Sequence, residues 1–281
     1  MISVRPPAVA GTFYPAEAGE LGALLDHCFN SSPLGPQGTR AAHPGMIAGM
    51  VPHAGPIYSG PCAAHLYARL DRSIDRVIVL GVDHRARGHK ASLGPWKRWR
   101  TPLGEVEVGD AMSDYLLARV GFLNRDARAH SGEHSIEIQL PFLQRALEAF
   151  ALAPISLTFL SVDECATLAA AIAALCEAEA AEKRKTMILA SSDLNHYLSP
   201  RQTEELDRFA LDQVLALNPA GLLHVVEEKD ISMCGVLPTA VMLFAAQALG
   251  AKGARLLKHC HSGDVAPMSK VVGYASVAIE H

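Results

Sequence analysis

From residue 46 onward, short apolar runs alternate with longer stretches in which apolar residues recur at helical spacing. Short runs bounded by Gly, Pro or polar residues are typical of buried strands, and long periodic stretches are typical of amphipathic helices. The pattern predicts strands at Met46–Val51, Arg76–Val82, Ala153–Leu160, Thr186–Ala190, Ala254–Cys260 and Val271–Ile279. It predicts helices at Ala18–Phe29, Pro61–Leu70, Asp110–Val120, Ser135–Ala149, Glu164–Ala181, Thr203–Leu217, Pro219–Glu228 and Leu237–Leu249.

This alternation predicts an α/β fold of three layers (α/β/α), in which helices cover both faces of a central mixed or mainly parallel sheet. Residues 89–108 interrupt the alternation, and the turn Thr101-Pro102-Leu103-Gly104 within them predicts a hairpin. Residues 30–44 are rich in Ser, Pro and Gly and predict an exposed connector. Because there is no internal repeat and no clear interdomain linker, we expect a single domain over residues 1–281.

Three of the predicted strands lead into a histidine. His53 and His84 follow the first two strands, and His196 follows Thr186–Ala190. Ligands of open α/β sheets collect at the carboxyl ends of the strands. Imidazole suits iron, copper and zinc, and strand ends fix a ligand better than loops do. One such histidine would favour a backbone hydrogen bond at the strand end, but three favour a shared site that holds a metal.

If only two of these histidines bind the metal, the site needs a further ligand, either a thiolate or a carboxylate. Cys234 lies just before the predicted helix Leu237–Leu249, where the helix N-terminus lowers the pKa of a thiol. It is equally consistent with a buried apolar cysteine. Asp193 precedes His196 by three residues, and it either orients the second nitrogen of a histidine or caps the following turn.

The segment Gly132–Pro141 has the pattern of a helix start. We expect Glu133 and His134 to project from its first turn as site residues or as simple caps, and Pro141 to bend the helix. His259 and His261 share one face of a predicted strand, but without a third ligand we expect them not to bind metal.

The composition narrows the class of partner and the compartment. Apolar residues make up 49% of the chain and charged residues 19%, with a net charge of −4. This balance gives no electrostatic reason to expect nucleic acid or membrane as a partner. No apolar segment approaches the length of a membrane span, and the first residues lack the pattern of a signal peptide. The six cysteines show no paired spacing, which is typical of the reducing cytoplasm.

Several motifs match one known family in the expected order along nearly the whole chain. The chain resembles the Memo family, whose fold is similar to that of the class III extradiol dioxygenases, the LigB-like enzymes. The matching segments are Arg5–Pro15, His53-Ala54-Gly55 with Tyr58-Ser59-Gly60, Glu133–Glu137, Ser191-Ser192-Asp193, Cys234-Gly235, Ser262-Gly263-Asp264 and Val272–Ala275.

The resemblance implies specific roles. The metal-binding positions of the family fall on His53, His84 and Cys234, and Cys234 stands where the dioxygenases carry a carboxylate. The active-site histidines away from the metal fall on His134 and His196. This makes His196 an acid/base or substrate-contacting residue instead of a third ligand, with Asp193 beside it.

The resemblance also implies an iron- or copper-dependent protein, with zinc as a further possibility, that carries redox or oxygenase-type activity on an unknown substrate. The alternative is a non-enzymatic module that binds metal, or that receives a peptide or protein in the old catalytic pocket. Memo-like proteins of bacteria and archaea are further linked to a radical-SAM protein and an AMMECR1-like protein, which are the expected partners. Extradiol cleavage itself would be an analogy of fold.

Overall fold

A computed structural model describes residues 3–38, 42–43 and 45–281. Within them, strands form a twelve-stranded mixed sheet. At its centre, β8 (Ala151–Leu157), β3 (Arg76–Val82), β9 (Thr186–Ser191) and β2 (Met46–Val51) lie side by side and parallel, and β12 (Val271–Glu280) pairs antiparallel with β2. The carboxyl ends of β2, β3 and β9 therefore meet at one edge of the sheet.

The remaining strands extend both sides of this centre. On the β8 side, β5 and β6 form the predicted antiparallel hairpin, with β1 beside β5. On the other side, β10 and β11 both pair with β12. The bounds of these strands are β1 (Val4–Arg5), β4 (Ala91–Leu93), β5 (Arg98–Thr101), β6 (Gly104–Val108), β7 (Leu123–Arg125), β10 (His196–Leu198) and β11 (Gly253–His261).

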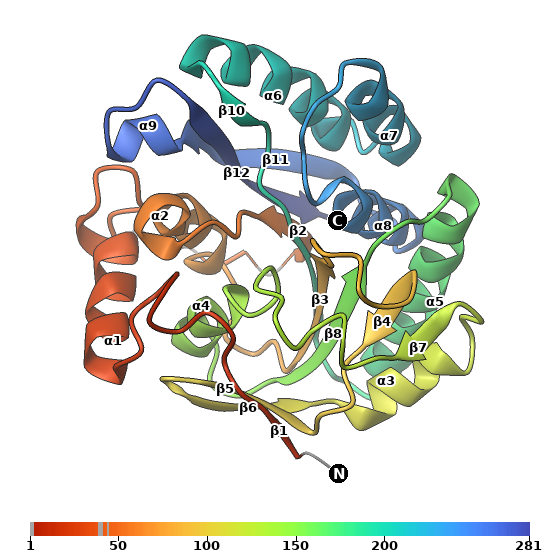
Figure 1. Cartoon of the computed structure of the whole chain (residues 1–281). Helices are drawn as coiled ribbons and strands as arrows, with labels where there is room; N and C mark the ends of the chain where they lie inside the picture. Colours follow the sequence, from red (N-terminus) through yellow and green to blue (C-terminus); the bar gives the residue numbers. More distant parts are fainter. Residues whose placement is uncertain (1–2, 39–41, 44) are drawn as a thin grey trace.

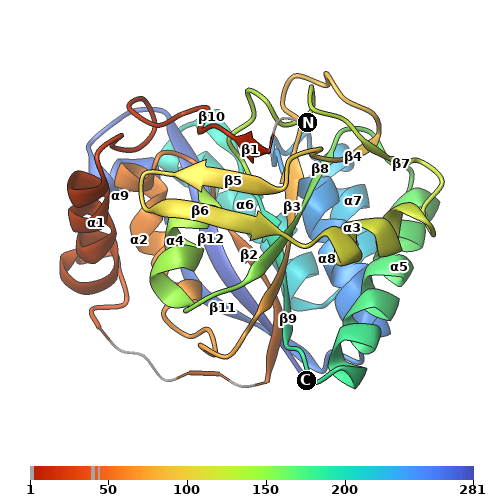
Figure 2. The ribbon, with the colours of Figure 1, turned by 90° about the horizontal axis from the view of Figure 1, so that it is seen from below.

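Helices cover both faces of the sheet, which confirms the predicted three-layer α/β/α fold (Figures 1 and 2). The first face carries α1 (Ala18–Asp26), α2 (Pro56–Tyr67) and α4 (Gln139–Ala146), with a short π-helix at His27–Ser31 continuing α1. The second face carries α3 (Asp110–Leu117), α5 (Val162–Ala181), α6 (Pro200–Leu215), α7 (Pro219–Glu228) and α8 (Val236–Ala248). The four-residue helix α9 (Ser262–Val265) lies between β11 and β12.

The central strands alternate between two hydrophobic cores. In β3, Ile78 and Leu80 pack with the helices of the second face, whereas Val77 and Val79 pack with those of the first. Successive side chains of a strand point to opposite faces, so a strand covered on both sides is apolar at every position. This explains why β2 and β3 are continuous apolar runs with the predicted bounds.

The predicted helix at Ser135–Ala149 was wrong at its start. Residues up to 138 form turns, and α4 begins at Gln139. Pro141 consequently lies in the first turn of α4, where its missing N–H costs no helical hydrogen bond, so no bend is required. Glu133 and His134 thus stand in the turns that precede the helix.

Two further sequence features can be placed. In the predicted connector, Ser32, Gly35 and Pro36 are buried, while residues 39–41 and 44 lie outside the described part of the chain. Across the described residues, every helix is too short or too polar to cross a bilayer.

Candidate metal centre

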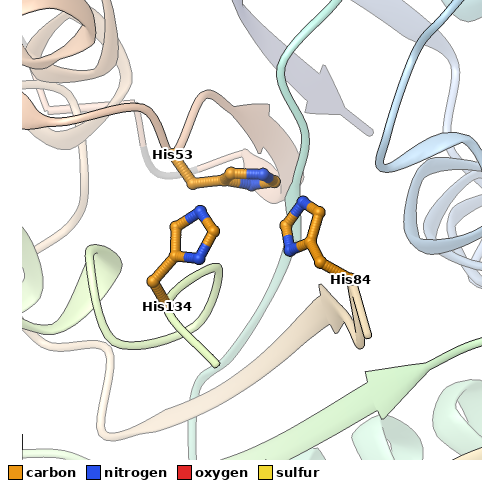
Figure 3. Close-up of side chains that lie close together, drawn as sticks. All are labelled: His53, His84 and His134. Atoms are coloured by element: carbon orange, nitrogen blue, oxygen red, sulfur yellow. The ribbon is translucent and has the colours of Figure 1, made fainter. Parts of the chain in front are cut away.

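Three histidine side chains meet at the carboxyl edge of the central strands (Figure 3). His53 stands two residues beyond β2, His84 two residues beyond β3, and His134 comes from the turns before α4. One ring nitrogen of each lies within 4.8 Å of the others. The ring centroids are 5.2 Å apart for His53 and His84 and 4.8 Å apart for His84 and His134. This group could hold a metal ion.

The tautomer of His53 follows from its hydrogen bonds. Its Nδ1 lies 2.9 Å from the hydroxyl oxygen of Ser191. That hydroxyl donates its only hydrogen to the carbonyl of Ser135 at 2.7 Å and accepts from the side-chain amide of Gln139 at 2.8 Å. Nδ1 of His53 must therefore be the donor, because the hydroxyl has no second hydrogen. Nε2 of His53 is left as a lone-pair donor to a metal.

Glu133 orients the other two histidines. Its carboxylate accepts a hydrogen bond from Nδ1 of His84 at 3.0 Å and another from the backbone N–H of His84. It also accepts from the backbone N–H of His134 at 2.7 Å, and its Oε1 lies 3.3 Å from Nδ1 of His134. Since Nδ1 of His84 faces a pure acceptor, its Nε2 remains free for a metal. Carboxylates hold metal-binding histidines in this way.

The electrostatics of the pocket favour the neutral imidazole at His53 and His134, and favour the charged form at His84. Burial, followed by the charge of His84, lowers the pKa of His53 to about 3. Burial, followed by the charge of His53, lowers the pKa of His134 to about 4. Burial also acts to lower the pKa of His84, but the hydrogen-bonded Glu133 outweighs it and the net shift is upward. Neutral imidazole is the form that coordinates metals.

Cys234 lies at the edge of the same site. Its Sγ is 3.2 Å from Nε2 of His53, the nitrogen left free for a metal. Burial, followed by the charge of Asp193, raises the pKa of the thiol, so the expected lowering by the helix N-terminus is outweighed. The next residue must be glycine, because a Cβ on Gly235 would lie 2.4 Å from the carbonyl oxygen of Ser191.

Asp193 holds the backbone that carries His53. Its carboxylate accepts from the N–H of His53 at 2.8 Å and from that of Ala54 at 3.2 Å. Burial raises the pKa of this carboxyl. Its role here is to fix the turn after β2, and neither of the two roles considered from the sequence describes these hydrogen bonds.

His196 lies outside the group of three histidines. It begins β10, and its Nδ1 donates to the carbonyl of Ser232 at 2.8 Å while its ring packs against Tyr197. The predicted assignment of His53, His84 and Cys234 as ligands, with His134, His196 and Asp193 as catalytic groups, therefore stays a prediction. What the fold adds is that His134 stands as close to the site as the strand-end histidines do.

The sequence pattern missed three supporting residues. Ser191 and Gln139 orient His53, and the ring of Phe13 packs 4.8 Å from that of His134. Ser191 directly follows the predicted strand Thr186–Ala190, so its position at a strand end was the available signal. His259 and His261 instead face Asp207 and Glu204 of α6, and they are not part of the three-histidine group.

Comparison with known proteins gives one consistent result. A family model described as Memo-like protein matches residues 5–278. A MEMO1 family protein of Ignicoccus hospitalis is 42% identical over 98% of this chain and 98% of its own length. The MEMO1 family protein of Methanopyrus kandleri is 39% identical over 97% of this chain and 98% of its own length. That of Methanocaldococcus jannaschii is 35% identical over the whole of both chains. These names state a family and no reaction.

Proposed function

The chain belongs to the Memo family, and we propose that it binds a redox-active transition metal and carries oxidoreductase activity of the oxygenase type on a substrate still to be identified. The observation that supports this proposal is the pair of orienting contacts, from Ser191 to His53 and from Glu133 to His84. Both contacts place the proton of the neutral ring on Nδ1, so that Nε2 carries the lone pair a metal would need. A structural histidine needs no such arrangement.

The donor set fits iron or copper. His53, His84 and His134 would supply imidazole nitrogens, with Cys234 as the alternative third ligand. When bound, such a metal would supply one-electron redox chemistry and Lewis acidity. Zinc fits the same nitrogen and sulfur donors, so the choice of iron or copper over zinc is part of the proposal.

The protein's own residues then supply binding and proton handling. Phe13 packs on the ring of His134 and forms one side of the site. His196 keeps Nε2 free because its Nδ1 donates to Ser232, and we propose that it exchanges protons with the substrate. Asp193 keeps the turn of His53 in place.

A non-enzymatic metal-binding module is the second candidate function, and Cys234 favours it. A thiolate close to an imidazole suits tight binding of soft metals, and it replaces the carboxylate expected of a dioxygenase. We further propose a cytoplasmic location, since all six cysteines are free. Partnership with a radical-SAM protein and an AMMECR1-like protein remains a proposal from the resemblance.

Oxygen uptake separates the two functions. The protein is purified without oxygen, loaded with iron or copper, and assayed with catechols, with other phenols and without substrate. Substrate-dependent uptake that falls by about 10²–10⁴-fold in His196→Ala, with metal content retained, would support the enzyme. Metal binding without substrate-dependent uptake would favour the binding module.

A further inference from the structure

A groove lies beside the metal centre, on the first face of the sheet. The turn at residues 11–16, the start of α1 and Ile57 of α2 border an open groove with a volume of about 560 Å³. This volume is within the range of small-molecule sites. The groove adjoins the metal centre through Phe13, whose ring packs 4.8 Å from the ring of His134. In Figure 1 its elements lie at the red and orange side of the molecule.

The walls of the groove expose large apolar side chains. Ile57 is 60% exposed and Phe13 39% exposed, and Leu24 lines the groove from α1. Single exposed apolar residues are ordinary on a protein surface, but several converging on one concavity indicate a contact surface. The groove therefore suits a ligand with an apolar or aromatic body.

The rim of the groove is negatively charged. Glu17 and Glu20 line it, and both are exposed. Lysine, arginine and histidine are absent from its lining, and among the described residues neither carboxylate takes part in an ion pair. Two exposed carboxylates without an ion-pair partner among the described residues, beside an apolar wall, are complementary to an amphipathic cation.

The wall of the groove is preformed. The N–H of Gly11 donates to the carbonyl of Tyr14 at 2.7 Å, and the N–H groups of Thr12 and Phe13 donate to the carbonyl of Val9. The hydroxyl of Tyr14 donates to the buried carboxylate of Glu137 at 2.6 Å. A ligand that enters this groove does not need to order its wall, which removes one cost of binding.

We propose that this groove binds a small amphipathic cation, consisting of an apolar or aromatic group with a primary ammonium. The body packs against Ile57 and Phe13, and the ammonium lies between Glu17 and Glu20. This inference goes beyond the proposed redox function, because it requires no metal. Its test therefore uses the metal-free protein, so that failure of the metal site cannot affect it.

Calorimetric titration with three matched probes tests the proposal. Phenethylamine carries a cation, phenethyl alcohol is neutral and hydrocinnamate is an anion. We expect phenethylamine to bind tightest, and its affinity to fall by about 3- to 10-fold in Glu17→Gln/Glu20→Gln and with added salt. The affinity for phenethyl alcohol should not change in that variant. In Ile57→Ser, phenethylamine and phenethyl alcohol should both bind more weakly, because the apolar contact is shared.

A matched control removes the same charge elsewhere. Glu177 and Glu182 lie on or just beyond α5, on the opposite side of the molecule from α1 (Figure 1). Glu177→Gln/Glu182→Gln should leave the phenethylamine affinity at the parental value. Equal affinity for all three probes, an unchanged affinity in Glu17→Gln/Glu20→Gln, or no saturable binding of phenethylamine would each overturn the proposal.

Discussion

The carboxylate of Glu133 accepts a hydrogen bond from Nδ1 of His84 at 3.0 Å, and a second from the backbone N–H of the same residue. These two contacts fix both the ring orientation and the tautomer of His84. Because the same carboxylate also receives the backbone N–H of His134, one buried acid aligns two of the three histidines. Glu133 thus has the position of a supporting residue of a metal centre.

The variant Glu133→Gln should bind metal about 10- to 100-fold more weakly, because the amide keeps the shape of the side chain and loses its charge. Competition with a chelator measures this affinity. Glu148→Gln, at an exposed position, provides the control and should match the parent. An unchanged affinity in Glu133→Gln would remove Glu133 from the metal site.

The variant Glu137→Gln should lose stability more than metal affinity. Glu137 is buried and accepts hydrogen bonds from Arg5 at 2.6 Å, from Tyr14 and from the backbone N–H groups of Ala8 and Val9. Removing its charge leaves the buried Arg5 guanidinium unpaired, at a cost of about 3–5 kcal/mol in the free energy of unfolding.

Urea denaturation measures this change. Glu105→Gln, which breaks exposed ion pairs with Arg98 and Arg100, should change the free energy of unfolding far less. Equal effects of the two substitutions would show that the Arg5–Glu137 pair does not anchor the N-terminal segment.

The metal-free protein should lose stability as the pH falls from about 6.5 to 4. Burial, followed by the charge of Arg5, lowers the pKa of His130 to about 4. Its Nε2 donates to the carbonyl of Ser92, and its buried Nδ1 has no hydrogen-bond partner among the residues that the structure describes, so a second proton would be an unpaired donor. Between these pH values the unfolded state binds the extra proton and the folded state does not. The resulting loss is roughly 3 kcal/mol for this residue.

Denaturation at several pH values checks the sign and the source of this loss. His53 and His134 add to the same slope, so the difference between parent and His130→Gln isolates His130. The variant should be less stable at neutral pH but should show a shallower decline. A His130→Gln variant as steep as the parent would contradict the assignment.

The two possible third ligands can be separated by spectroscopy of the cobalt-substituted protein. Thiolate coordination gives a sulfur-to-cobalt charge-transfer band, which imidazole coordination does not. If Cys234 binds the metal, this band is present in the parent and absent in Cys234→Ser. If His134 is the third ligand, the band is absent in the parent, and His134→Ala loses affinity where Cys234→Ser does not.

The sequence pattern predicted the bounds of the strands that are buried in the centre of the sheet. The bounds of β2 and β3 were confirmed because both strands are buried on both faces and bounded by turn residues. His53 and His84 were found for the same reason, since each stands two residues beyond one of these strands. Position relative to a strand is visible in a linear sequence.

Features that depend on contacts between residues far apart in the sequence could not be predicted from the sequence pattern. The helix predicted from Ser135 begins at Gln139, because the preceding turns are held by Glu133 and by the contact of Arg5 with the carbonyl of Glu133. The same fold brings His134 to His84. Neither contact leaves a periodic signal, so the sequence pattern left His134 open between a site residue and a simple cap, and the resemblance favoured the active site. Trp96 and Trp99 of the hairpin region pack against His130.

Metal affinity in single-histidine variants tests the central claim most directly. Chelator competition is measured for the parent, for His53→Ala and for His84→Ala, with His224→Ala as control and circular dichroism to verify folding. The parent and the control should bind about one equivalent of iron or copper, and the two variants should lose this tight binding. Parental affinity in folded His53→Ala or His84→Ala would contradict a metal centre at this edge of the sheet.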